Sequence, residues 1–307
     1  MSTALPSLTN PDLGLLRVFL TVVHSGGFSA ARTELNVSQP TISAKIADLE
    51  SRLGMRLCER GRGGFKLTTE GQRVYEATLN LFQSLETFKS EIGLVRGRLV
   101  GDLHIGIADA TVTNTALKLN ETITLFKKNA PDVHLHLHVA SATELELGLV
   151  ENRLHIVVGP LQRRRPELVY TPILIEAQAL YCARNHPLFA RAPDEINVSD
   201  LSTVEFARRG YLTHWQPPLG VQFRATATTV HMEATTRLIL SGNYIGYLPV
   251  HHAEAWVKKG KLRPILPKLL SYDSTFLLAT RRSLGSGAQR RFLKDFRTVQ
   301  DHHQPLS

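Results

Sequence analysis

The segment around residue 40 carries polar side chains whose types and spacing suit contact with nucleic acid. Ser38 follows a short break at Asn36-Val37 and can cap a helix, and Pro40 is tolerated in the first turn of that helix. A helix N-terminus binds phosphate through free backbone N–H groups, and Gln, Ser and Thr side chains can hydrogen-bond base edges. The DNA-contact candidates in this segment are therefore Ser29, Ser38, Gln39, Pro40, Thr41, Ser43 and Lys45.

Three short helices are required to position these side chains. The first can begin at Asn10-Pro11 and end at Gly26-Gly27, because apolar residues recur at i, i+3, i+4 and i+7 from Leu16 to Val23. Ser29 can cap a second helix, and a third repeats apolar residues at spacings of 4, 3 and 4 from Ile42 to Leu53. Two short helices joined by a tight turn predict a helix-turn-helix whose last helix enters the DNA groove.

Two short strands with a basic tip are predicted directly after the third helix. Residues 56–60 and 65–68 flank the sequence Gly61-Arg62-Gly63-Gly64, which is typical of a flexible turn. Arg60, Arg62 and Lys66 would then lie on a wing beside the DNA. The alternative is that these three are ordinary solvated charges. Their position behind a helix-turn-helix favours the wing.

Residues 12–71 resemble the LysR-type transcriptional regulators. Cys58 stands where that family usually has Phe, and Ala44 stands where it often has a larger polar residue, so Ala44 is not expected to read bases. The segments that carry the resemblance are Leu16-x-x-Phe19, Gly27-Phe28-Ser29-x-Ala31, Leu35-x-Val37-Ser38-Gln39-Pro40, Ile42-Ser43, Ile46-x-x-Leu49-Glu50, Leu53-Gly54, Leu57-x-x-Arg60 and Leu67-Thr68-x-x-Gly71.

A long helix is predicted between the wing and the rest of the chain. Thr69 and Gln72 have the spacing of a capping box, and no proline follows before about Val95. About 25 helical residues would span roughly 37 Å. An apolar stripe with the period of a coiled coil either packs on its own domain or pairs with a second copy. The resemblance implies dimerisation through Val74, Leu81, Leu85, Phe88 and Ile92.

From residue 99 onward, predicted strands and helices alternate, which indicates an α/β domain. A strand over Leu103–Ile107, a helix over Thr113–Asn129 and a strand over Val133–Val139 would form a βαβ unit. Ligands in such sheets bind at the carboxyl ends of strands, beside helix N-termini. The first such place is Ala108–Thr113, where hydroxyl groups either cap the helix or bind an anion. Asp109 would oppose a bare carboxylate ligand.

The resemblance continues in this domain at lower density and implies a periplasmic-binding-protein-like sensor, with the effector between two subdomains. His155 replaces an acidic residue that is common at its position. The matching segments are Pro131-Asp132-Val133, Leu149-x-x-x-x-Leu154-x-Ile156, Asn185-His186-Pro187-Leu188 and Gly246-Tyr247-Leu248-Pro249. By position, the implied effector-binding residues are Ala108, Asp109, Ala110, Thr111, Gly159, Pro160, Arg209, Thr228, Thr229, Tyr244 and Gly246.

The predicted organisation is α/β overall with three parts. Residues 1–70 form a winged helix-turn-helix, residues 71–98 a linker and dimerisation helix, and residues 99–307 an effector-binding domain. Subdomain I of the last part covers about 99–172 and 273–307, and subdomain II about 173–272. The implied partners are double-stranded DNA, a small and anionic organic effector, further copies of the chain in a homodimer or homotetramer, and RNA polymerase.

Composition and missing motifs narrow the remaining classes. The formal charge of +9 favours a polyanionic partner, and Cys58 and Cys182 lie too far apart for a CxxC site. No signal peptide or apolar run long enough for a membrane span is present, so we expect a cytoplasmic protein. Signatures such as GxSxG, a P-loop or HExxH are also absent, which favours a regulator without cofactor over an α/β enzyme or solute-binding protein fused to a vestigial DNA module.

Three histidines, His134, His136 and His138, would share one face of a strand. Neighbours on such a face lie nearly 7 Å apart along the strand, too far for simple tetrahedral closure around one ion. We therefore predict solvated histidines rather than a metal site.

Overall fold

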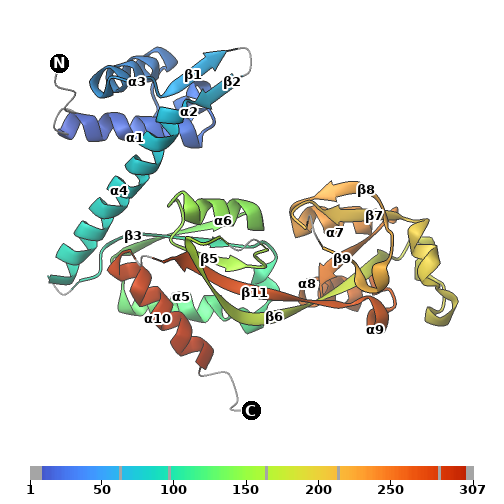
Figure 1. Ribbon diagram of the computed structural model, residues 1–307. Coiled ribbons are helices and arrows are strands. Elements are labelled where there is room, and N and C mark those ends of the chain that lie inside the picture. Colours follow the sequence, from blue (N-terminus) through green and yellow to red (C-terminus); the bar gives the residue numbers. More distant parts are fainter. Residues whose placement is uncertain are drawn as a thin grey trace. The chain divides into compact units, whose positions relative to one another are not determined.

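The computed structural model describes residues 9–61, 64–95, 98–162, 165–212, 215–282 and 285–301 (Figure 1). The chain divides into two compact units, Met1–Glu86 and Thr87–Ser307. One helix, α4 (Thr69–Val95), begins in the first unit and ends in the second.

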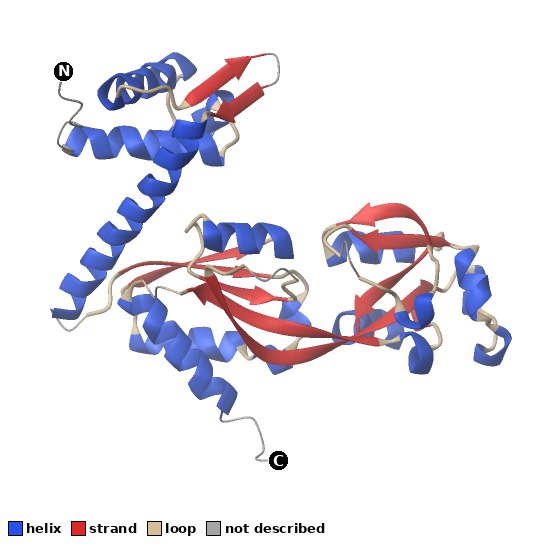
Figure 2. Ribbon diagram, in the orientation of Figure 1, coloured by secondary structure: helices blue, strands red, loops and turns tan. Residues whose placement is uncertain are grey.

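The first unit has the predicted three helices and two strands. A buried cluster that includes Phe19, Ile42, Ile46 and Leu49 joins the helices, and Tyr75 of α4 packs into the same cluster. The strands pair antiparallel, so the predicted wing is confirmed (Figure 2). The elements are α1 (Asn10–His24), α2 (Phe28–Leu35), α3 (Gln39–Leu53), β1 (Cys58–Gly61) and β2 (Gly64–Leu67).

The helix starts differ from the prediction at two of the first three helices. Thr9, not Asn10, caps α1, because its backbone N–H and its hydroxyl both hydrogen-bond the Asp12 carboxylate. Gly27 precedes α2 with a φ of 146°, a value that favours glycine, so Ser29 lies inside the first turn instead of capping it. Ser38 caps α3 as predicted.

The start of α4 also lies one residue earlier than predicted. The Thr68 hydroxyl accepts the backbone N–H of Gly71 at 2.8 Å and donates to the carbonyl of Arg56 at 2.7 Å. The proposed capping box from Thr69 to Gln72 is therefore wrong, and the Gln72 amide donates to Glu76 instead. The hydroxyl of Thr68 ties the helix start to the segment just before the first strand of the wing.

One nine-stranded sheet runs through the second unit in the order β4-β3-β5-β11-β6-β9-β7-β8, and β10 pairs with β6. The long strands β6 and β11 pair antiparallel and are shared by two lobes. The strands are β3 (Gly101–Ile107), β4 (Val133–Val139), β5 (Ile156–Gly159), β6 (Leu168–Ala183), β7 (Glu205–Arg209), β8 (Arg224–Thr229), β9 (Tyr244–Pro249), β10 (Leu262–Pro264) and β11 (Tyr272–Arg281).

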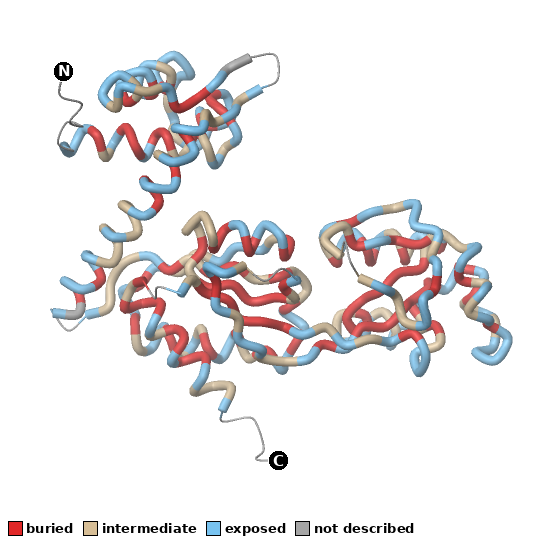
Figure 3. Tube along the Cα trace, in the orientation of Figure 1, coloured by how far each residue is buried: buried red, intermediate tan, exposed pale blue. Residues whose placement is uncertain are grey.

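Helices cover both faces of the sheet in each lobe (Figure 1). In lobe I, defined by β3, β4, β5 and the adjoining parts of β6 and β11, apolar clusters lie under α5 and α10 on one face and under α6 on the other. In lobe II, which holds β7 to β10, α7 and α8 cover one cluster and α9 covers another, and the central strands are buried (Figure 3). The helices are α5 (Leu119–Asn129), α6 (Ala142–Val150), α7 (Met232–Leu240), α8 (Val250–Lys258), α9 (Pro267–Leu270) and α10 (Gly287–Asp301).

The predicted βαβ unit is present, with β3 and β4 parallel, but its helix is shorter than predicted. The helix begins at Leu119 rather than Thr113, and two 3-10 turns, Thr111–Thr113 and Thr115–Leu117, come before it. Lys118 interrupts the helical path with a left-handed φ of 53°. The expected helix N-terminus beside Ala108–Thr113 is therefore absent from this described segment.

Among the described residues, no single helix is both long and apolar enough to cross a membrane. Helices α1 and α2 meet the length and composition test only as a pair, with a bend of 120° between them.

Candidate functional site

The first turn of α3 presents most of the predicted DNA-contact residues to solvent. Gln39, Pro40 and Thr41 are exposed there, whereas Ile42 and Ile46 on the opposite side of the helix are buried. The Ser38 hydroxyl lies 2.8 Å from the Thr41 hydroxyl and fixes the start of the helix. The remaining candidates on this surface are Ser29 and Lys45, both exposed, and Ser43, which is half-buried.

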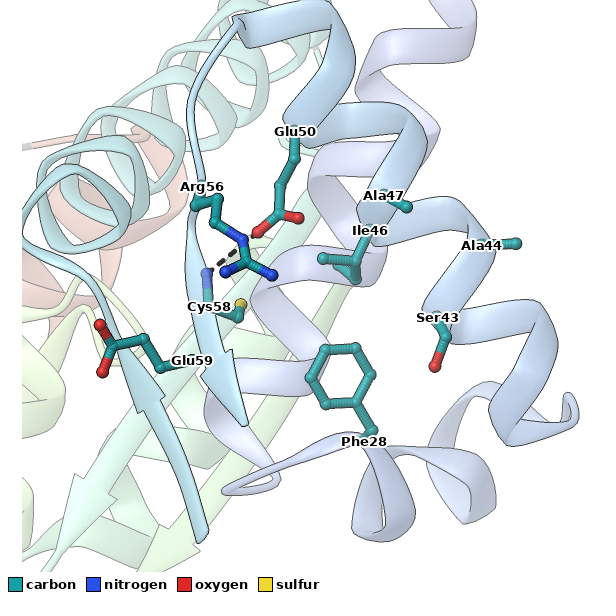
Figure 4. Close-up of a pocket in the computed structure, with 9 residues that line it drawn as sticks. All are labelled: Phe28, Ser43, Ala44, Ile46, Ala47, Glu50, Arg56, Cys58 and Glu59. Carbon is teal, nitrogen blue, oxygen red and sulfur yellow. Dashed lines mark hydrogen bonds between the residues drawn. The ribbon is translucent and has the colours of Figure 1, made fainter. Parts of the chain in front are cut away.

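A groove of about 760 Å³ separates α3 from the wing (Figure 4). Ser43, Ala44 and Ala47 line it from α3, and Arg56 and Glu59 line it from the other side. The Glu50 carboxylate accepts the backbone N–H groups of Leu57 at 2.7 Å and Cys58 at 3.1 Å. These two bonds hold the wing at a fixed distance from the recognition helix. The small side chain of Ala44 leaves this wall open.

On the wing, Lys66 is exposed on β2 and stands opposite Glu59 of β1. Arg60 pairs with Phe65 through its backbone, but its side chain lies outside the described atoms. Arg62 lies outside the described residues altogether.

The apolar stripe of α4 divides into two parts. Val74 and Leu81 are half-buried and pack against the core of the first unit, so the alternative of packing on the chain's own domain holds for them. Leu85 is half-buried, and farther along the helix Phe88 is 63% exposed and Ile92 42% exposed. The first half of the stripe is thus part of a core, and the second half is an apolar surface.

The two lobes meet at a nearly closed cleft. Its cavity measures about 20 Å³, which holds about one water molecule. Ala108, Asp109, Pro160 and Arg209 line it, as the resemblance implied. Tyr211 also lines it and falls within the stretch from Arg209 to His214 that the resemblance assigns to the effector site. Four further lining residues were not singled out from the sequence, namely Ser141, Glu176, Met232 and Pro249.

Other predicted effector residues have different surroundings. Thr111 is buried and donates its hydroxyl hydrogen to the carbonyl of Ala108, and Ala110 beside it has a left-handed φ of 58°. The Thr229 hydroxyl is 2.7 Å from that of Thr235. Four predicted residues do not line the cavity. Gly159 faces Ala108 and Leu145, and Gly246 packs on Ile239. Thr228 is exposed on β8, and Tyr244 lies at the opposite end of β9 from Pro249.

A carboxylate from lobe I occupies the N-terminus of a helix in lobe II. Asp109 accepts the backbone N–H of Met232, the first residue of α7, and lies 3.9 Å from the His231 ring. A negative charge is stabilised at this end of a helix. The anion-binding helix end of this cleft therefore belongs to α7, and the protein's own side chain fills it.

A chain of polar side chains crosses the base of the cleft. Glu176 on β6 accepts hydrogen bonds from His251 at 2.7 Å, Asn114 at 3.2 Å and Gln178 at 2.6 Å. Gln178 in turn accepts a hydrogen bond from the Arg209 guanidinium at 2.8 Å. The Nε atom of Arg209 has no hydrogen-bond partner in the described part of the chain. Since Asn114 belongs to lobe I and His251 to lobe II, Glu176 links the lobes.

Tyr211, which lies near Arg209 in the cleft, can donate a hydrogen bond from its hydroxyl group. Burial raises the pKa of Tyr211 above its ordinary value, so its hydroxyl keeps its proton at neutral pH. The cleft thus combines a guanidinium, a hydroxyl donor and two carboxylates, and it can bind a ligand that carries both an anionic group and a donor.

The three histidines of β4 belong to a larger cluster than the sequence indicated. His104 of β3 stacks on His136 at 4.1 Å between ring centroids, and its Nδ1 is 3.2 Å from Nε2 of His138. His155 completes the group from the side, and its Nδ1 accepts the backbone N–H of His104. Burial and the neighbouring imidazoles lower the pKa of His104 to about 4. No group of three His, Cys, Asp or Glu among the described residues has the geometry of a metal site.

Comparison with known proteins identifies both parts of the chain. Residues 13–72 match the family model "Bacterial regulatory helix-turn-helix protein, lysR family", and residues 96–301 match "LysR substrate binding domain". The transcriptional activator BauR of Pseudomonas aeruginosa is 38% identical, over 91% of this chain and 92% of its own length. The SDS degradation transcriptional activation protein of a Pseudomonas species is 26% identical, over 91% of this chain and 93% of its own length.

Solved structures show the same fold. The Vibrio cholerae virulence activator AphB superposes with a TM-score of 0.58 at 18% identity, over 93% of this chain and 98% of its own. CbnR, solved in complex with its target DNA, gives a TM-score of 0.57 at 20% identity, over 94% and 99% of the two chains. The curated relatives are transcriptional regulators and not enzymes.

Proposed function

We propose a role for each part of this chain, which belongs to the LysR family. It is a transcriptional regulator with a DNA-binding helix-turn-helix and an effector-binding domain. The first turn of α3 and the wing bind a two-fold related DNA site, the exposed end of α4 joins two copies, and the cleft between the lobes binds a small organic acid. The observation that carries the proposal is the exposed polar first turn of α3 beside a basic wing.

On the DNA-binding surface, we assign base reading and phosphate contact to different residues. Gln39 and Thr41 lie exposed at the start of α3, where side chains reach base edges in the major groove. Lys66 on the wing suits phosphate contact, which depends on charge and not on sequence. Regulation through RNA polymerase requires access to the chromosome, so we place the protein in the cytoplasm.

Fluorescence anisotropy on a footprinted site from upstream of its own gene, and on random DNA, tests this division. Gln39→Ala and Thr41→Ala should each cost about 1–3 kcal/mol on the preferred site and less on random DNA. Lys66→Gln should weaken binding to both DNAs and lower the slope of log affinity against log salt by about 1. Equal losses on both DNAs for the α3 variants would remove Gln39 and Thr41 from base reading.

For assembly, we propose that the second half of the α4 stripe pairs with a second copy, in a homodimer or homotetramer. In the last turns of α4 the side that faces α10 is buried through Ser90, whose hydroxyl accepts the N–H of Gly287 at 2.9 Å. Large apolar side chains are exposed there beside the charged Lys89 and Glu91, with Phe88 63% and Val95 86% exposed. Large apolar side chains that face solvent favour a partner along the exposed face.

For the effector, we propose an organic acid that also carries an amine or hydroxyl donor. Arg209 and the N-terminus of α7 favour a carboxylate, and Asp109 favours a donor group. A ligand of this kind is larger than the cavity of about 20 Å³, so it binds when the lobes separate and the Asp109 contact with Met232 breaks.

A further inference from the structure

A second cavity lies in lobe I, away from the cleft between the lobes. It measures about 320 Å³ and is formed where α10 crosses β6 and β11. Small-molecule pockets commonly measure about 300–1,000 Å³, and this cavity falls in that range. We call it the α10 pocket.

The inner wall of the α10 pocket is apolar. Leu278 of β11 and Leu293 and Phe296 of α10 line it, and each is at most 8% exposed. Pro172 and Ile173 of β6 line it from the other side. These side chains can cover the hydrocarbon part of a ligand, because apolar surface removed from water stabilises the complex.

The lining also carries an excess of positive charge. Arg281, Arg282 and Arg297 line the pocket, and Asp301 is its one acidic lining residue among those described. Arg282 donates one hydrogen bond to the carbonyl of Pro166, which leaves other N–H groups of its guanidinium available to the pocket. The Arg281 guanidinium bonds the carbonyl of Val150 at the end of α6, on the other face of the sheet, so Arg282 and Arg297 are the arginines that a ligand can reach. Arg297 forms no hydrogen bond or ion pair within the described ranges.

One hydroxyl group belongs to the same lining. Thr280 of β11 lines the pocket beside Leu278 and the arginines. A hydroxyl can donate a hydrogen bond to a carboxylate oxygen.

We propose that the α10 pocket binds a small amphipathic carboxylate. The hydrocarbon part contacts Leu278, Leu293 and Phe296, and the carboxylate lies against the arginines, which bind carboxylates through paired N–H groups. This site is separate from the cleft between the lobes and takes a different ligand class, because it offers arginines and apolar surface without the two carboxylates of the cleft.

Isothermal titration of the full chain with 4-iodobenzoate tests the proposal. Arg297→Gln should weaken binding about tenfold, since it removes one charge-assisted contact without breaking an ion pair. Lys294→Gln removes a charge from an exposed position of the same helix that does not line the pocket, and should leave the affinity unchanged. The neutral analogue 4-iodobenzamide should bind at least tenfold more weakly than the acid.

Crystals grown with 4-iodobenzoate locate the ligand by the anomalous signal of iodine, which should lie between β11 and α10. An iodine position confined to the cleft between the lobes would overturn the proposal. So would equal effects of the Arg297 and Lys294 variants, or the lack of saturable binding by the unmodified chain.

Discussion

Gly71 lies where the start of α4 packs closely against Leu57, just before the wing. Replacing it with alanine should raise stability through helix propensity and lower stability through a steric clash. A Cβ atom at this position would lie 2.0 Å from the carbonyl oxygen of Leu57 and 2.8 Å from its carbonyl carbon. This oxygen cannot move away easily, because it accepts the N–H of Thr68 at 3.0 Å. The backbone N–H of Leu57 is held in turn by Glu50. The helix start must therefore shift relative to the wing.

The expected loss in Gly71→Ala follows from these contacts. Helix propensity alone would stabilise an alanine by about 1 kcal/mol relative to glycine. Overpacking costs about 1–3 kcal/mol, and contact with fixed backbone points to the upper part of this range. We expect a net loss of about 2 kcal/mol in the free energy of unfolding of the first unit, together with weaker DNA binding.

Gly14→Ala is the matched control, because Gly14 also lies in a helix and its Cβ would meet no atom within 4 Å. Alanine there should stabilise the unit by up to about 1 kcal/mol. Hydrogen exchange of α1 and α3 in the full chain measures both changes. If Gly71→Ala stabilises the unit as Gly14→Ala does, the contact with Leu57 is relieved without cost and the reasoning is wrong.

Three further outcomes are expected. Phe88→Asp should shift the assembly toward the monomer in sedimentation experiments, because it places a charge in the proposed interface. Asn80→Asp adds the same charge at an exposed position outside the apolar stripe and should leave the assembly unchanged. If Phe88→Asp also leaves the assembly unchanged, the interface lies elsewhere. The pKa of His104 is about 4 in the folded protein against 6.5 in the unfolded chain, so the unfolded chain gains the proton first as the pH falls from 6.5 to 4. The free energy of unfolding should therefore decrease by about 1–2 kcal/mol over this range, after allowance for solvent screening. In urea denaturation, His104→Asn should show a smaller decrease. Asp109→Ala should strengthen binding of bare carboxylates and weaken that of amino acids by about tenfold or more in thermal-shift titrations; equal effects on both classes would separate Asp109 from the ligand.

The elements that the sequence predicted correctly are those determined by nearby residues. Apolar spacing within single helices and strands was enough for the three N-terminal helices, the wing and the β3-α5-β4 unit. The start of α5 was not predictable in this way, because Lys118 adopts a left-handed conformation that its residue type does not signal. The first half of β6 gave no clear apolar pattern, since its residues are largely exposed or half-buried and pair with β11, which follows about a hundred residues later.

The candidate sites show the same division between local and distant information. The first turn of α3 could be assigned because its cap and its exposed polar residues are consecutive in the sequence. The contact between Asp109 and Met232 joins residues 123 positions apart, and the cluster around His104 draws on three separate segments. Such contacts depend on how the sheet is assembled, and the pattern of a single segment does not contain them.

Two of the polar connections between the lobes would be affected differently by a ligand in the cleft. Glu176 lies on β6, which both lobes share, and its bonds to Asn114 and His251 sit at the base of the cleft. Asp109 reaches across the cleft to the start of α7. A ligand between the lobes must replace the Asp109 contact, and it can leave the Glu176 bonds in place. We therefore infer that lobe separation pivots near Glu176. A ligand affects transcription only through unequal affinity for two arrangements, and under the proposed effector binding an added carboxylate would favour the arrangement without the Asp109 contact.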